Sequence, residues 1–177
     1  MNKKKLATVW LDGCSGCHMS ILDMDELLIE LNELVELVYS PLVDHKIIPD
    51  DIDITLVEGA ISSTDDLEKI HKLRKNSAMI VSLGDCAVTG NVPSMRNHFN
   101  VKEVMSRSYE ENVDENPGSP TLVVPQLLPQ TRPVHEYVKV DFYIPGCPPS
   151  AAAIHHVLTE LLNGQCPDVS EMTRFGA

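Results

Sequence analysis

Four of the five cysteines in this chain stand in three short turns, each directly after an apolar run typical of a buried strand. Cys14 and Cys17 share the turn GCSGC, Cys86 lies in GDC, and Cys147 lies in PGCPP. Turns that follow parallel strands all lie at one edge of a sheet. We therefore expect thiols that are far apart in sequence to converge at that edge.

Apolar strand patterns alternate with helical patterns along the chain. A helix is predicted from about residue 19 to residue 36, a second one buries Leu67, Ile70 and Leu73, and a last one ends at Gly164. This alternation predicts a single flavodoxin-like α/β domain over residues 1–177, a doubly wound parallel sheet with its site at the carboxyl ends of the strands. The predicted strands are 6–10, 37–39, 54–57, 78–83 and 138–144.

The segment from about residue 112 to residue 133 does not fit this alternation. A loop of this length inside a compact domain is functional or disordered. It contains apolar pairs at 123–124 and 127–128, so we interpret it as extended chain lying on a partner. A loop packed across its own domain remains an equal alternative. The segment holds five of the chain's twelve prolines, at Pro117, Pro120, Pro125, Pro129 and Pro133.

Charge and hydropathy narrow the class of protein. The net charge is 14 − 26 = −12, which argues against a nucleic acid or an anionic membrane as partner. No apolar stretch approaches the roughly 20 residues of a membrane span, and the N-terminus lacks a secretory pattern. These features predict a cytoplasmic, reducing location, where cysteines bind metals or act in catalysis more often than they form disulfides.

Four convergent thiolates are the ligand set of a [4Fe–4S] cluster. Glycine-rich turns suit such a cluster, because backbone N–H groups can approach its sulfurs closely. The residues leave three alternatives open. These are a structural zinc site, a thioredoxin-like dithiol that uses only Cys14 and Cys17, and cysteines that merely fill small buried spaces.

Four blocks of the sequence resemble, in order, the signature blocks of [NiFe]-hydrogenase small subunits. The blocks are CSGC at 14–17, VEGAI at 57–61, GDCA at 84–87 and PGCPP at 145–149. Further segments at 17–20, 22–26, 91–97 and 132–136 are similar to the bidirectional, NAD-linked soluble branch of that family. The resemblance runs from about residue 7 to residue 162, which is nearly the whole chain.

This resemblance implies one proximal [4Fe–4S] cluster on Cys14, Cys17, Cys86 and Cys147. It also implies a separate large subunit that holds the Ni–Fe centre, and diaphorase subunits that carry FMN and further iron–sulfur clusters and reduce NAD⁺. The chain would then be the electron-transfer subunit of a hydrogen:NAD⁺ oxidoreductase, with no bond chemistry of its own. Exported small subunits carry a twin-arginine leader and a cysteine-rich C-terminal half, and neither pattern is visible here.

The cluster-bearing subunit of respiratory complex I is a related alternative, because it shares the fold and the PGCPP block. Its first two cluster ligands are adjacent cysteines. In this chain Ser15 and Gly16 separate Cys14 from Cys17, which favours the hydrogenase branch.

Other polar residues near these turns carry weaker expectations. Glu58 ends a predicted strand on the cysteine edge, so it is either a redox-linked base and conditional iron ligand or an acceptor of backbone hydrogen bonds. Arg96 is either a partner for a carboxylate on the large subunit or part of an ordinary surface ion pair. We expect His18 to support or pack against the site, and Cys166 to be incidental.

Overall fold

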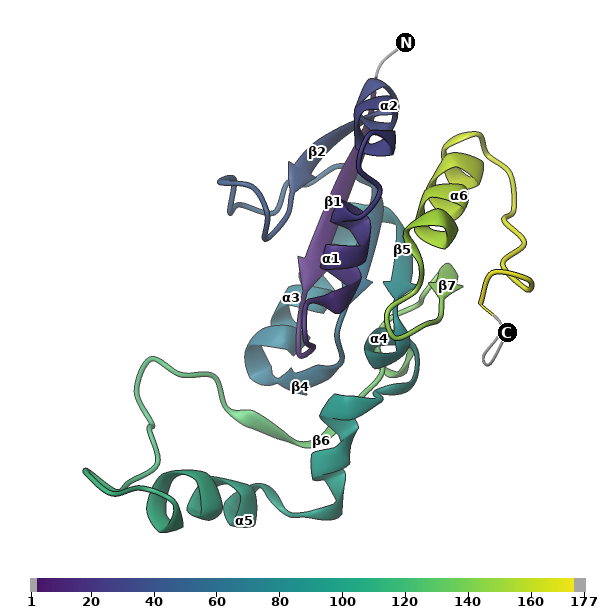
Figure 1. Cartoon of the computed structure of the whole chain (residues 1–177). Coiled ribbons are helices and arrows are strands. Elements are labelled where there is room, and N and C mark those ends of the chain that lie inside the picture. The colour runs from purple at the N-terminus through teal and green to yellow at the C-terminus, as the bar shows by residue number, and fades with distance from the viewer. Residues whose placement is uncertain (1–2, 174–177) are drawn as a thin grey trace.

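A computed structural model describes residues 3–173, so the ends of the predicted 1–177 domain lie outside the described part. Its main sheet has five parallel strands in the order β2-β1-β3-β5-β7 (Figure 1). Counting only these strands along the chain, the order is 2-1-3-4-5, as in flavodoxin-like folds. The predicted fold class is therefore confirmed. The strands are β1 Lys4–Trp10, β2 Val35–Tyr39, β3 Ile52–Glu58, β5 Ser77–Leu83 and β7 Phe142–Ile144.

The strands end in register at one edge of the sheet. Trp10 pairs with Glu58, Glu58 pairs with Leu83, and Leu83 pairs with Ile144. These four residues form a row across four neighbouring strands. Each chain segment that leaves this row begins a turn at the carboxyl edge, as the sequence predicted.

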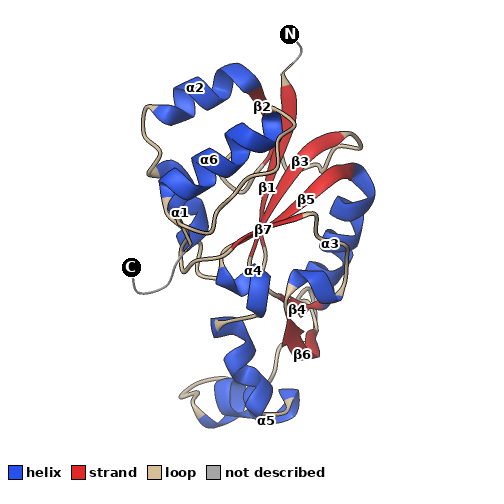
Figure 2. Ribbon diagram, turned by 90° about the vertical axis from the view of Figure 1, so that its right-hand side faces the viewer, coloured by secondary structure: helices blue, strands red, loops and turns tan. Residues whose placement is uncertain are grey.

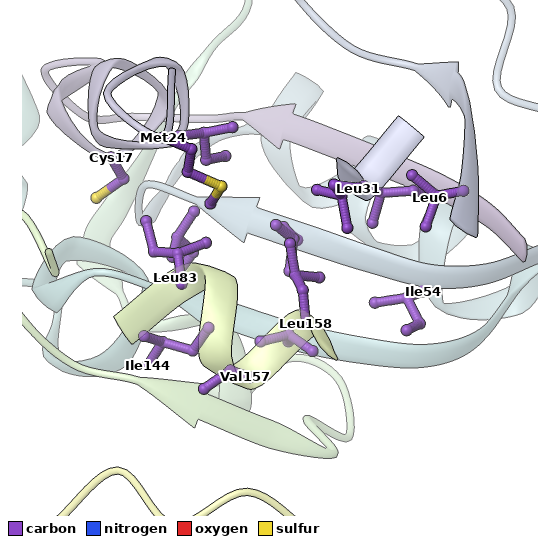
Figure 3. Close-up of a cluster of buried hydrophobic side chains, with 14 residues drawn as sticks. Leu6, Cys17, Met24, Leu31, Ile54, Leu83, Ile144, Val157 and Leu158 are labelled. Carbon is purple, nitrogen blue, oxygen red and sulfur yellow. The ribbon is translucent and has the colours of Figure 1, made fainter. Parts of the chain in front are cut away.

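Helices cover both faces of the sheet. Figure 2 shows α1, α2 and α6 on one face and α3 on the other. Helices α1, α2 and α6 pack on a cluster that includes Leu56, Leu83 and Ile154. Figure 3 shows Cys17 at one end of this cluster. Helix α3 buries Ile70 and Leu73 in a second cluster. The helices are α1 Gly16–Leu22, α2 Leu27–Leu34, α3 Thr64–Asn76 and α6 Ala151–Leu162.

Two predicted elements were wrong in extent. The helix expected at 19–36 is interrupted, because Asp25 has a φ of 48°, and Val35 already begins β2. Met24 and Leu31 lie in the same hydrophobic cluster on either side of the break, so the apolar spacing conceals it. The strand expected at 138–144 shortens to β7, because the backbone N–H of Val138 donates to the carbonyl of Val134 at 3.2 Å and so continues a 3₁₀ turn, η3 Val134–Glu136.

Residues 92–133 form an arm that extends beyond the carboxyl edge of the sheet (Figure 1). Its β6 pairs antiparallel with β4, so part of the proline-rich segment packs on its own chain. Residues 112–126 between η2 and β6 form no helix or strand, and the side chains of Leu122 and Val123 are exposed. The edge and arm contain β4 Ile61–Ser63, α4 Asp85–Thr89, η1 Val92–His98, α5 Val101–Ser106, η2 Arg107–Glu111 and β6 Leu127–Arg132.

No helix within residues 3–173 combines the length and the apolar character that a membrane crossing requires.

Asp141 joins the last strand region to β5 and α3. Its carboxylate accepts from the backbone N–H of Ile80 at 2.9 Å and forms an ion pair with Arg74. Burial alone would raise the pKa of Asp141, but the hydrogen bonds from Ile80, Arg74 and Lys139 outweigh it and lower the pKa below its ordinary value. The carboxylate therefore stabilises the fold at neutral pH.

Replacement of Asp141 with asparagine is expected to lower the free energy of unfolding by about 1–2 kcal/mol at pH 7, because a charged hydrogen-bond acceptor is lost. The pKa of Asp141 is lower in the folded protein than in the unfolded chain, where it is about 3.9. The stabilisation by the carboxylate is therefore complete above about pH 3.9 and is lost as the pH falls through the folded pKa. Urea unfolding at pH 7 and at pH 3 checks this. If the two proteins differed in free energy of unfolding by the same amount at both pH values, the predicted role of the Asp141 carboxylate would be contradicted.

Candidate functional site

The three cysteine turns lie next to one another at the carboxyl edge because the backbone joins them. The turn after β1 is bonded to the end of β3, with Leu11 N–H donating to the carbonyl of Glu58 at 2.9 Å. Asp12 and Ala60 then exchange two backbone hydrogen bonds. The turn after β5 is bonded to the end of β7, with Gly84 N–H donating to the carbonyl of Ile144 at 2.8 Å.

Asp85 holds the Cys86 turn against the Cys147 turn. Its backbone N–H donates to the carbonyl of Gly146 at 2.8 Å, and its carboxylate accepts from the N–H of Gly146 at 2.7 Å. This reciprocal pair fixes the position of one cysteine relative to the other across 61 residues of sequence. The spacing of the GDC block alone did not predict this role for Asp85.

The Cys14–Cys17 turn packs against the other two. The hydroxyl of Ser20 donates to the carbonyl of Pro149 at 2.5 Å, which ties α1 to the PGCPP turn. A Cβ atom built on Gly84 would lie only 2.2 Å from Cys17 Sγ, so this glycine leaves the space that the thiol occupies. A Cβ atom on Gly16 would approach less closely, at 3.3 Å from Cys14 Sγ and 3.9 Å from Pro148 Cβ.

The structure therefore brings the four predicted cysteines to one place, in two different environments. Cys17 and Cys86 are buried, whereas Cys14 and Cys147 are exposed, and all are free thiols. Burial raises the pKa of the Cys17 thiol well above its ordinary value, and the Glu58 carboxylate and the three other cysteines raise it further. Burial likewise raises the pKa of Cys86 to about 11. Each thiolate opposes the ionisation of the others, so a cationic centre is needed to hold all four deprotonated.

These four thiols fit a [4Fe–4S] cluster. Among the described residues, no three His, Cys, Asp or Glu side chains lie close enough together to share a single metal ion. A [4Fe–4S] cluster places each cysteine on a different iron, so its ligands surround a wider space than the ligands of one ion. The donor set also matches, because four cysteine thiolates are the ligands of such clusters.

Glu58 is buried beneath the first cysteine turn, with 1% of its surface exposed. Its carboxylate accepts from the backbone N–H groups of Cys17 at 3.3 Å and His18 at 3.0 Å, and it contacts Nδ1 of His18. His18 Nε2 lies 3.0 Å from the hydroxyl of Thr8, which in turn contacts Ser40. Glu58 thus accepts backbone hydrogen bonds, and the His18 ring contacts the same carboxylate oxygen as the His18 backbone N–H.

Arg96 lies on η1, and its hydrogen bonds join the arm to β4. Its Nη2 donates to the carbonyls of Ser62 at 2.9 Å and Leu128 at 3.0 Å, so it joins η1 to both strands of the small sheet. Within residues 3–173, its Nε and Nη1 atoms are buried without a hydrogen-bond partner. The ordinary surface ion pair considered for Arg96 is absent from the described part of the chain. Cys166 lies after α6 and is exposed.

Comparison with protein families matches residues 14–161 to the family described as NADH ubiquinone oxidoreductase, 20 kDa subunit. The chain is 42% identical to the HoxS subunit delta of an NAD-reducing hydrogenase from Cupriavidus necator, over 98% of this chain and 86% of that protein. It is 38% identical to one subunit of the vhu F420-non-reducing hydrogenase of Methanocaldococcus jannaschii. That match covers 92% of this chain but only 57% of the methanogen protein.

Among solved structures, the chain is similar to a chain of an NAD⁺-reducing [NiFe]-hydrogenase in the H₂-reduced state. The TM-score is 0.93 at 37% identity, and the match covers 98% of this chain and 99% of that one. A [NiFeSe]-hydrogenase of Dm. baculatum matches with a TM-score of 0.58 at 17% identity, over 98% of this chain and 70% of that one. This second likeness concerns the fold alone.

Proposed function

Because this chain belongs to the NADH ubiquinone oxidoreductase 20 kDa subunit family, in its NAD-reducing hydrogenase branch, we propose that it binds one [4Fe–4S] cluster and relays electrons between two partner subunits. Family membership makes it a small subunit of an oxidoreductase complex. The observation that carries the cluster proposal is the convergence of Cys14, Cys17, Cys86 and Cys147 from three turns to one edge.

Each of these cysteines would supply one thiolate, and a bound cluster would take up and release one electron at a time. In the full reaction, H₂ gives two protons and two electrons, and NAD⁺ takes two electrons and one proton to become NADH. We assign the splitting of H₂ to a Ni–Fe centre in a large subunit. We assign the reduction of NAD⁺ to diaphorase subunits with FMN and further iron–sulfur clusters. This chain would break no bond itself.

Two parts of the chain are suited to the partner interfaces. Cys14 and Cys147 are exposed at the carboxyl edge, so we propose that the large subunit covers this edge. The exposed Leu122 and Val123 lie in the 112–133 segment, which we propose rests on a partner subunit. The Nε and Nη1 atoms of Arg96 are buried within this chain, so an ion pair with a carboxylate of the large subunit would require the Arg96 side chain to leave its present position. We also propose that the complex works in the cytoplasm.

We assign Glu58 a role in cluster redox chemistry, as a base or conditional iron ligand, because its carboxylate lies under Cys17 and raises the pKa of that thiol. Glu58→Gln keeps the size of the side chain and removes its charge. A cluster spectrum and a pH dependence of the reduction potential that match the unmodified protein would exclude this role and leave only the backbone contacts.

Anaerobic purification followed by metal and sulfide analysis tests the proposed function. We expect about four irons and four sulfides per chain, and an EPR signal that appears on reduction. One zinc and no redox spectrum would instead indicate a structural zinc module. A colourless protein that reduces disulfides through Cys14 and Cys17 would indicate a thiol oxidoreductase.

A further inference from the structure

The turn between α4 and η1 reaches two of the four cysteine sulfurs. The side-chain amide of Asn91 donates from Nδ2 to Cys147 Sγ at 3.5 Å. The backbone N–H of the next residue, Val92, favours the thiolate form of Cys86. Cys86 and Cys147 belong to different turns, so one short segment lies beside the sulfurs of both.

Asn91 adopts a backbone conformation that suits glycine. Its φ is 26° and its ψ is −123°, and the preceding Gly90 also has a positive φ, of 86°. A residue with a Cβ is strained in this region, at a cost of order 1–3 kcal/mol. Strain at a site beside cysteine ligands points to a function for the side chain, because glycine would relieve it.

The turn is fixed well enough to aim this amide. The carbonyl of Asn91 accepts from the hydroxyl of Ser94 at 2.7 Å and from its N–H at 3.2 Å. The Ser94 N–H also donates to the carbonyl of Gly90 at 3.1 Å. The position of the Asn91 side chain is thus set by the start of η1 and not by chance at a free loop.

We propose that Asn91 raises the reduction potential of the cluster through its hydrogen bond to the Cys147 sulfur, an inference that rests on the proposed function. Reduction adds negative charge that spreads onto the ligating sulfurs. An N–H donor stabilises that charge and so favours the reduced form, and hydrogen bonds to sulfur are a known determinant of cluster potential. Asn91 acts through Cys147 and ligates no iron itself.

The test compares potentiometric EPR titrations of the assembled complex with Asn91 or with Asn91→Gly. Glycine suits the backbone and keeps the Val92 N–H, so only the side-chain donor is lost. We expect unchanged iron content and a reduced-to-oxidised ratio lower by about fivefold to tenfold at a fixed ambient potential, as for loss of a charge-assisted hydrogen bond. Asn91→Asp, which keeps the side-chain size but replaces the donor with an acceptor, should lower the ratio at least as far.

Asp25→Gly is a matched control for the backbone change, because Asp25 also has a positive φ, of 48°, and is exposed between α1 and α2. It should leave the titration curve unchanged. An intact cluster with equal potentials in Asn91→Gly and the unmodified complex would overturn the inference and leave the proposed function standing. Loss of iron in Asn91→Gly would also overturn it, since that would assign Asn91 to assembly. An unmodified complex whose EPR spectrum contains no signal that depends on Cys14, Cys17, Cys86 and Cys147 would overturn both.

Discussion

Replacing Cys147 with serine is expected to remove the cluster and to lower H₂-driven NAD⁺ reduction by more than about a hundredfold. Loss of a supporting residue around a metal site costs about tenfold to hundredfold, and loss of a ligand should exceed that. A serine hydroxyl is also a harder and more weakly acidic ligand than a thiol, and iron–sulfur clusters select soft thiolates. Iron and sulfide analysis of the purified complex, together with the activity, measures the effect.

Cys166→Ser is the matched control for this variant. Cys166 is exposed after α6 and lies outside the three cysteine turns, so its loss should leave iron content and activity unchanged. A Cys147→Ser protein with a full complement of iron and sulfide would contradict the assignment of Cys147 as a ligand. A thioredoxin-like protein would keep its disulfide activity in both variants, because that activity requires only Cys14 and Cys17.

Replacing Gly84 with alanine is the second change with a large expected effect. The added Cβ would lie 2.2 Å from Cys17 Sγ and 3.4 Å from the carbonyl oxygen of Gly146. Because the first distance is far below van der Waals contact, the buried thiol must move away from its position among the other cysteines. Gly84 also has a φ of 80°, where a side chain adds backbone strain. We expect loss of most of the iron that this chain binds and a fall in stability of about 2–5 kcal/mol.

Gly164→Ala separates the effect of backbone strain from the effect of the close contact with Cys17. Gly164 also has a positive φ, of 73°, but a Cβ there would meet no atom within 4 Å. The Gly164→Ala variant should lose only about 1–2 kcal/mol of stability, because of backbone strain, and its iron content should be unchanged. Thermal unfolding and iron analysis of both variants measure the difference. A Gly84→Ala protein with normal iron content would show that Cys17 tolerates displacement and is not held by this contact.

Much of the fold was predictable because apolar periodicity reports which face of an element is buried. The runs at 54–57 and 78–83 correctly located β3 and β5, and Gly164 follows the end of α6 as expected. The same signal failed at Asp25, because Met24 and Leu31 face one cluster across a break in the backbone. Periodicity records the direction of side chains and does not record the continuity of a helix.

The convergence of the cysteine turns was predictable for a topological reason. Parallel strands place all their following turns at one edge, and each cysteine turn follows such a strand. The residues that hold these turns together were not predictable in the same way. Asp85 and Ser20 act through hydrogen bonds to Gly146 and Pro149, and such pairs over 60 or more residues leave no periodic pattern in sequence.

The contacts of Asn91 and His18 were hidden for a similar reason. The unusual backbone of Asn91 depends on its position beyond α4, and asparagine is a common residue in ordinary turns. His18 contacts Glu58 only because β3 lies beside β1 and α1 packs over both strands. The strict order of the four signature blocks was informative about family, but it contained no information about these supporting contacts.

An X-ray diffraction measurement at the iron absorption edge, on anaerobically grown crystals of the complex, tests the central claim most directly. We predict one compact group of four iron peaks at the carboxyl edge of the sheet, with the sulfurs of Cys14, Cys17, Cys86 and Cys147 each bonded to a different iron. A carboxyl edge without iron signal, or iron held by other residues while these four sulfurs remain unbound, would contradict it.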